Sequence, residues 1–151
     1  MSKRSTILII TLATAIILAT TAFGGMMRAH GRDAKVPPAS EFGPGPRVSA
    51  KGLYIVTLQG AKPLAPRKMY TLKAIVTDAG SQRVSGATIA IGGGMPQHGH
   101  GLPTRPRVTR NLGDGGYEIS GLRFNMGGWW ELKLTITSPA GTDTVTFNLQ
   151  V

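Results

Sequence analysis

The chain has 151 residues, with 17 Lys and Arg against 7 Asp and Glu, 3 His and no Cys, which gives a formal net charge of +10 at pH 7. This length fits one domain plus a leader. The lack of Cys excludes disulfides and thiolate metal ligands, so any metal site must use His, Met or carboxylate side chains. It also argues against a blue-copper electron carrier of the cupredoxin type, whose site uses a Cys thiolate.

Residues 1–25 predict a signal peptide or a transmembrane anchor helix. Lys3 and Arg4 precede an uncharged apolar run of about 19 residues. A basic start before an apolar core is typical of export signals, and the run approaches the ~20 residues that span a bilayer. Ala22-Phe23-Gly24 is a mediocre cleavage site, which favours a retained anchor in the cell membrane. The domain then faces the periplasm or cell exterior, or is released to the periplasm if the leader is cleaved.

The excess positive charge can be accounted for in several ways. Nucleic acid is excluded as a partner, because the protein is expected to be exported and its cations are dispersed with few aromatic residues between them. An anionic membrane surface is a better partner. The simplest account is that the cations form solvated faces that keep the protein soluble.

Residues 26–47 predict a linker, because they contain four prolines and few side chains that could enter a core. Such a composition favours an extended and mobile segment. His30 lies in this linker, where a lone histidine is expected to be exposed to solvent rather than to bind a metal.

Residues 48–151 predict a separate folded domain made of short alternating strands. In 130–137, for example, the alternation directs Leu132, Leu134 and Ile136 inward. About seven short strands over roughly 100 residues, with no helix outside the leader, indicate an all-β fold, an immunoglobulin-like antiparallel β-sandwich. The expected strands are 53–58, 69–77, 84–91, 116–120, 121–125, 130–137 and 144–151, and 105–111 is expected to be a short strand or an extended crossing.

The segment 91–104, IGGGMPQHGHGLPT, concentrates the candidate ligands. Gly and Pro disfavour both a helix and a central strand, so this segment is expected to be a loop. Met95, His98 and His100 offer one thioether and two imidazoles, and the two imidazoles point to the same side if the backbone is extended. Thioether and imidazole together favour copper, especially Cu(I), whereas imidazole alone also accepts Zn or Ni.

A second candidate segment is 124–130, FNMGGWW. Met126 becomes a further sulfur ligand if this connection lies at the same end of the sandwich as 91–104. A neighbouring Trp could shield the metal or offer its π face to a cation. Met126 could instead fill a gap in the core, as Met often does. Only one of the two adjacent tryptophans is expected to face inward.

A role without metal also fits the segment 91–104. Its glycines and prolines could simply shape a long connection, held closed by histidines that pair with backbone carbonyls, Glu118 or Glu131. No G-x-S-x-G elbow, phosphate-binding loop or acid pair is present in the sequence, so an enzyme is not expected.

The segments GGMPQHGHGLPT (93–104) and GGYEISGLRFNMGGWWEL (115–132) resemble the YtkA-like family and the related FixH-like exported domains. Members combine a leader or anchor with a small β-sandwich, and they share a Met-Pro-x-His-x-His-like loop and a later F-x-M-x-G-x-W segment. The resemblance covers about 69–151. Gly127 departs from the pattern, since many relatives carry proline there. By position, the resemblance implies Met95, His98, His100 and Met126 as metal ligands.

The resemblance also implies a role in metal handling, because FixH-like relatives are associated with copper delivery to terminal oxidases or with oxidase assembly. The leading hypothesis is a non-catalytic, membrane-anchored or periplasmic copper-binding and delivery protein. Its partner would be a metal-accepting membrane protein or an oxidase assembly. The alternative is an accessory or docking domain of a membrane (respiratory) complex that needs no metal.

Overall fold

The computed structural model describes residues 34–61 and 63–151, so the predicted leader and His30 lie outside the described residues. Within these two ranges, no helix is long and apolar enough to cross a membrane. The elements are a 3₁₀ turn and nine strands: η1 (Ala39–Glu41), β1 (Arg47–Val48), β2 (Tyr54–Gln59), β3 (Met69–Asp78), β4 (Thr88–Met95), β5 (His100–Gly101), β6 (Arg107–Gly113), β7 (Gly116–Arg123), β8 (Trp129–Ser138) and β9 (Gly141–Gln150).

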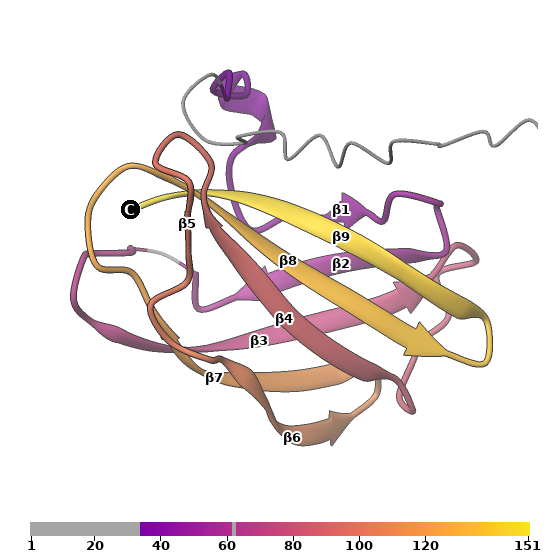
Figure 1. Ribbon diagram of the computed structural model, residues 1–151. Helices are drawn as coiled ribbons and strands as arrows, with labels where there is room; N and C mark the ends of the chain where they lie inside the picture. Colours follow the sequence, from indigo (N-terminus) through magenta and orange to yellow (C-terminus); the bar gives the residue numbers. More distant parts are fainter. Residues whose placement is uncertain (1–33, 62) are drawn as a thin grey trace, which may run out of the picture.

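The strands form two antiparallel sheets that pack face to face (Figure 1). One sheet has the order β1-β2-β3-β7-β6, and the other has the order β5-β4-β8-β9. Without the two-residue strands β1 and β5, the orders become β2-β3-β7-β6 and β4-β8-β9. These correspond to the A-B-E-D and C-F-G sheets of a constant-type immunoglobulin domain. The prediction of an immunoglobulin-like β-sandwich is confirmed.

The core lies between the sheets and is built by the alternating side chains that the sequence predicts. Leu132, Leu134 and Ile136 are fully buried, as are the inward residues of β9 up to Leu149. Trp130 is the largest fully buried side chain. Trp129 points to the opposite face of β8, as alternation requires, yet it is also buried, and its indole N–H donates to Asn148 Oδ1 at 2.9 Å. Because Asn148 of β9 accepts this hydrogen bond, the polar indole N–H of Trp129 can be buried outside the core.

The glycine-rich part of 91–104 is not a loop, and this expectation is wrong. Gly92, Gly93 and Gly94 continue β4 as far as Met95, between β5 and β8. The reason is close backbone packing. A Cβ at Gly93 would clash with the Glu131 carbonyl oxygen of β8, and a Cβ at Gly94 with the His100 carbonyl oxygen of β5. Glycine is thus required by the neighbouring strands, although its intrinsic preference for a strand is poor.

A single strand, β7, replaces the two short strands expected at 116–120 and 121–125. Its register with β3 shifts between Tyr70 and Thr71, which pair with Leu122 and Ser120. Gly121 is therefore the extra residue of a β-bulge, and the strand continues past it.

The last residues of the predicted linker pack against the sandwich. Phe42 forms a parallel bridge with Asn148 of β9, and the Gly43 N–H donates to the Asn148 carbonyl at 2.9 Å. The Leu58 N–H of β2 donates to the Pro44 carbonyl at 2.7 Å. Because Asn148 pairs with Glu131, near the start of β8, the chain joins the body at the end where β8 begins.

Candidate metal-binding site

Three connections meet at this end of the sandwich, which is called the Met/His end below. They are the β4–β5 turn (96–99), the β7–β8 connection (124–128) and the described parts of the β2–β3 connection (60–61 and 63–68). The first two lie at the same end in Figure 1. The backbone ties the last two together, because the Arg67 N–H donates to the Phe124 carbonyl at 2.6 Å.

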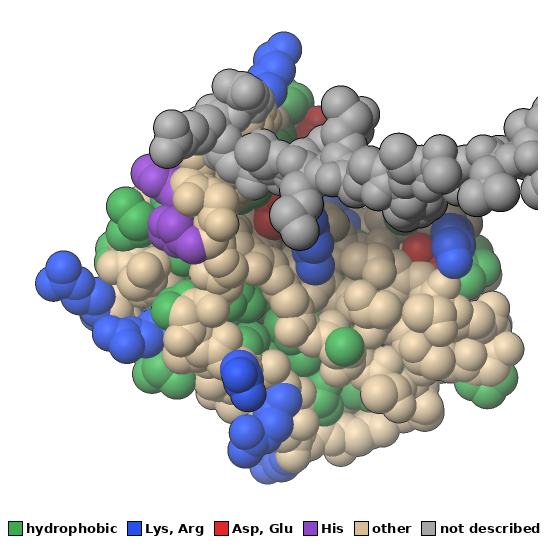
Figure 2. Space-filling view, viewed as in Figure 1, with side chains coloured by type: hydrophobic (Ala, Val, Ile, Leu, Met, Phe, Trp, Pro, Cys, Tyr) green, Lys and Arg blue, Asp and Glu red, His purple; other side chains and the backbone are tan. Residues whose placement is uncertain are grey.

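The β4–β5 turn positions the two histidines. The Met95 carbonyl accepts hydrogen bonds from the N–H groups of His98 and Gly99, at 3.1 and 3.0 Å. The turn therefore folds back on the last residue of β4, and His100 begins β5. Both imidazoles are exposed, and their ring centroids lie 5.5 Å apart. Figure 2 shows the two rings side by side on the surface.

Met95 and His100 form a directly opposed pair in the β4–β5 register. Directly opposed residues of antiparallel strands have Cβ atoms about 4.5–5.5 Å apart on the same face. Met95 is only 3% exposed and belongs to the core. Its methyl group packs on the β7–β8 connection, since a Cβ at Gly128 would lie 2.7 Å from Met95 Cε. Met95 thus contributes to packing, with its thioether on the same side of the ladder as the His100 side chain.

Trp130 links the histidines to the second candidate segment. The centroid of the His100 ring lies 6.4 Å from that of Trp130 in an edge-to-face arrangement. The Trp130 indole N–H donates to the Met126 carbonyl at 3.1 Å, and Phe124 packs edge-to-face on the indole at 5.2 Å. Met126 itself is 38% exposed, so it is not a core gap-filler.

Neither histidine is held by the acids that the sequence suggested as alternatives. Glu118 pairs with Arg110 at 2.9 Å, and Glu131 pairs with Lys133 at 2.8 Å. Within residues 34–61 and 63–151, no ion pair joins a histidine to a carboxylate. Among these residues, no carboxylate therefore competes with a ligand for the imidazole nitrogens.

The donor set decides which metals suit this site. In the described part of the chain, no three His, Cys, Asp or Glu side chains gather closely enough to hold an ion. A metal at the Met/His end would thus rely on two imidazoles supplemented by thioethers. Such soft and borderline donors fit copper and disfavour Ca and Mg, which prefer oxygen ligands.

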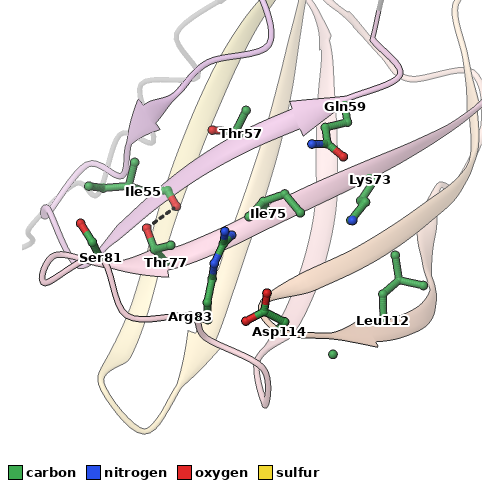
Figure 3. A pocket seen from close by; sticks show the side chains of 11 residues that line it. Ile55, Thr57, Gln59, Lys73, Ile75, Thr77, Ser81, Arg83, Leu112 and Asp114 are labelled. Carbon is green, nitrogen blue, oxygen red and sulfur yellow. Dashed lines mark hydrogen bonds between the residues drawn. The ribbon is translucent and has the colours of Figure 1, made fainter.

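A separate hollow lies on the outer face of the five-stranded sheet, with a volume of about 690 Å³ (Figure 3). Ile55 and Ile75 lie in adjacent strands along it, and Lys73 and Arg83 bring positive charge to it. It contains none of the predicted metal ligands. The lining residues are Ile55, Thr57, Gln59, Lys73, Ile75, Thr77, Ser81, Arg83, Leu112, Gly113 and Asp114.

Asp143 is a buried acid that no sequence motif marks. Burial opposes its ionisation. The Ser49 hydroxyl and the N–H groups of Thr144, Lys51 and Leu53 donate to its carboxylate and outweigh burial, so the pKa of Asp143 lies below its ordinary value. It lies at the end of the sandwich opposite the histidines and fastens the β1–β2 connection to β9. Its role is structural.

The fold and the donor set define a class: an immunoglobulin-like sandwich with a Met/His cluster at one end. A model of the YtkA-like family matches residues 50–135, and the chain belongs to this family. Among solved structures, the ZirS C-terminal domain is similar with a TM-score of 0.39 and 15% sequence identity, over 93% of this chain and 97% of that chain. No curated protein matches the chain.

Proposed function

We propose that this protein binds copper at the Met/His end and delivers it to a partner by ligand exchange, without catalysing a reaction. The observation that carries the proposal is the pair of exposed imidazoles 5.5 Å apart, which no described carboxylate binds, beside the thioether of Met95. Two imidazoles and thioether sulfur form a donor set that copper prefers, especially as Cu(I).

The four predicted ligands differ in accessibility, and this difference suits transfer. His98, His100 and Met126 are exposed, whereas Met95 is buried. A metal-accepting site can therefore approach from solvent and replace the exposed ligands one at a time. The acceptor would be a metal-binding membrane protein or an oxidase assembly, in line with the resemblance to FixH-like domains. An N-terminal anchor or an exported form would put the domain in the periplasm or outside the cell.

Copper titration of the full chain against a competing chelator tests this proposal. The variant His98→Ala/His100→Ala should lose most of its affinity, because it lacks both imidazoles. The matched control is Gln97→Ala, which changes an exposed residue of the same turn and should bind as the parent chain does. If the double variant binds copper as tightly as the parent chain, the site is not at the Met/His end.

A docking domain without metal is the second candidate, and the outer-face hollow favours it. Half-buried Ile55 and Ile75, with Lys73 and Arg83 beside them, give a partner protein both apolar area and charge. Purification of a membrane complex that survives a chelator and the loss of both histidines would favour this candidate. Loss of the complex in Ile55→Asp/Ile75→Asp would locate the contact.

A further inference from the structure

The Met/His end carries cations that form no ion pair with any residue that the structure describes. Arg67 and Lys68 are exposed on the β2–β3 connection, and Arg123 ends β7 directly opposite Met69. The ion pairs among the described residues, Arg110–Glu118 and Lys133–Glu131, involve none of these three cations. Figure 2 shows blue side chains projecting at the same end as the purple histidines. Three cations without an ion pair to the rest of residues 34–61 and 63–151 therefore lie at the end that holds the candidate metal site.

Exposed apolar side chains accompany these cations. Met69 is 61% exposed and Met126 is 38% exposed. Both come from segments joined by the hydrogen bond from Arg67 to Phe124. Cations next to exposed, flexible apolar side chains form the pattern that binds the boundary between headgroups and acyl chains.

The two ends of the sandwich differ in charge. The opposite end carries Asp78, Asp114 and Asp143 on its connections or beside them, together with Lys51 and Arg83. Of the acids that the structure describes, Glu41 of η1 and Glu131 lie at the Met/His end, and Glu131 pairs with Lys133. An anionic surface would therefore attract the Met/His end and not its opposite.

The chain also enters the sandwich at this end. Phe42 and Gly43 bind the Asn148 backbone near the start of β8, and 33 residues precede the described part of the chain. These residues include the predicted signal or anchor segment. The predicted tether therefore joins the body at the Met/His end and not at the opposite end.

From these observations we infer that the Met/His end docks on an anionic phospholipid surface. Arg67, Lys68 and Arg123 contact the headgroups, and Met69 and Met126 enter the interfacial layer. Each cation near an anionic leaflet strengthens association about fivefold at moderate salt, so three cations contribute on the order of a hundredfold. The inference concerns orientation and does not require metal.

The test uses the full chain reconstituted into vesicles, and the lack of Cys makes single-site labelling simple. Met69→Cys carries a polarity-sensitive fluorophore at the proposed contact. Ala140→Cys, in the exposed β8–β9 turn, carries the same label at the opposite end. In vesicles with phosphatidylglycerol, the Met69→Cys label should shift to the blue and be quenched by headgroup nitroxide lipid. In phosphatidylcholine alone, or at high salt, it should not.

Charge variants complete the test. Arg67→Gln/Lys68→Gln/Arg123→Gln should lower the ratio of docked to free domain about a hundredfold, whereas Lys51→Gln/Arg83→Gln, at the opposite end, should leave it unchanged. Unchanged tryptophan emission would show that each variant is folded. The inference is overturned if the Met69→Cys label responds equally in both lipids. It is also overturned if the label at Ala140→Cys responds as strongly, or if the triple variant docks like the parent chain.

Discussion

Met95 and His100 face each other across the short β4–β5 ladder, Met95 buried in the core and His100 exposed at the surface. The pair places a thioether and an imidazole on the same side of one ladder, at a Cβ separation of about 4.5–5.5 Å. His98 reaches the same place because the turn folds back on the Met95 carbonyl. Backbone hydrogen bonds thus bring the side chains of Met95, His98 and His100 together, and the Trp130 ring packs against His100.

The three consecutive glycines of β4 should differ in their tolerance of a methyl group. Gly93→Ala and Gly94→Ala should each lower the free energy of unfolding by more than about 1 kcal/mol, because the added Cβ would strike the backbone of β8 or β5. Gly92→Ala is the matched control, since a Cβ there meets no atom within 4 Å. Urea unfolding measures all three. Equal effects at the three positions would contradict the strand geometry.

Substitutions of the two methionines should have different effects: Met95 should affect folding stability, and Met126 should affect copper binding. Met95→Ala should cost about 2–5 kcal/mol of folding free energy, because it removes a buried side chain. Met126→Ala should change stability by less than about 0.5 kcal/mol, because the side chain is partly exposed. Met126→Leu should nonetheless weaken Cu(I) binding if its sulfur is a ligand. Thermal unfolding and Cu(I) competition distinguish the two effects, and a stable Met95→Ala would refute the packing role.

Trp130 should report copper binding through its emission. Cu²⁺ quenches nearby indoles, and the Trp130 ring centroid lies 6.4 Å from that of His100. The chain has two tryptophans, so Trp129→Phe leaves Trp130 as the sole source of tryptophan emission. Stoichiometric Cu²⁺ should quench this variant strongly. The same titration on a background of His98→Ala/His100→Ala should show little quenching, and undiminished quenching there would place the metal elsewhere.

Asp143 should make stability depend on acid pH. Burial raises the folded-state pKa of Asp143, but the four hydrogen-bond donors lower it by more. The folded-state pKa therefore lies below the unfolded value, which is about 3.9. Its contribution is therefore fully present above about pH 4 and is lost as pH falls through the folded-state pKa. Asp143→Asn should have a lower melting temperature at neutral pH and a flatter decline below pH 4. Parallel pH profiles of the two proteins would show that Asp143 is not the responsible group.

Most of the fold could be predicted because apolar and polar residues alternate along a strand that has one buried face. The expected strand at 130–137 and its inward residues Leu132, Leu134 and Ile136 match β8 closely. The glycine-rich end of β4 could not be predicted, because the requirement for glycine arises from backbones of β5 and β8 that are distant in sequence. The two-residue strands β1 and β5 were too short to produce any periodicity.

The sequence could predict which residues make up the candidate site, but it could not predict how their side chains pack. Spacing alone identified Met95, His98 and His100 as near neighbours. It could not indicate that Met95 is buried and directly opposite His100, since that depends on the register of β5. The burial of Trp129 through Asn148 was likewise invisible, because the two residues come from different strands. The bridge between Phe42 and Asn148 of β9 could not be predicted either, because these two residues are also distant in the sequence.

The ligand shell of the bound metal tests the central proposal most directly. Copper K-edge X-ray absorption of the Cu(I)-loaded full chain should show imidazole nitrogens together with sulfur at on the order of 2.3 Å. In His98→Ala/His100→Ala, the imidazole shell should disappear. A first shell of nitrogen and oxygen without sulfur, unchanged when both histidines are removed, would contradict copper binding at the Met/His end.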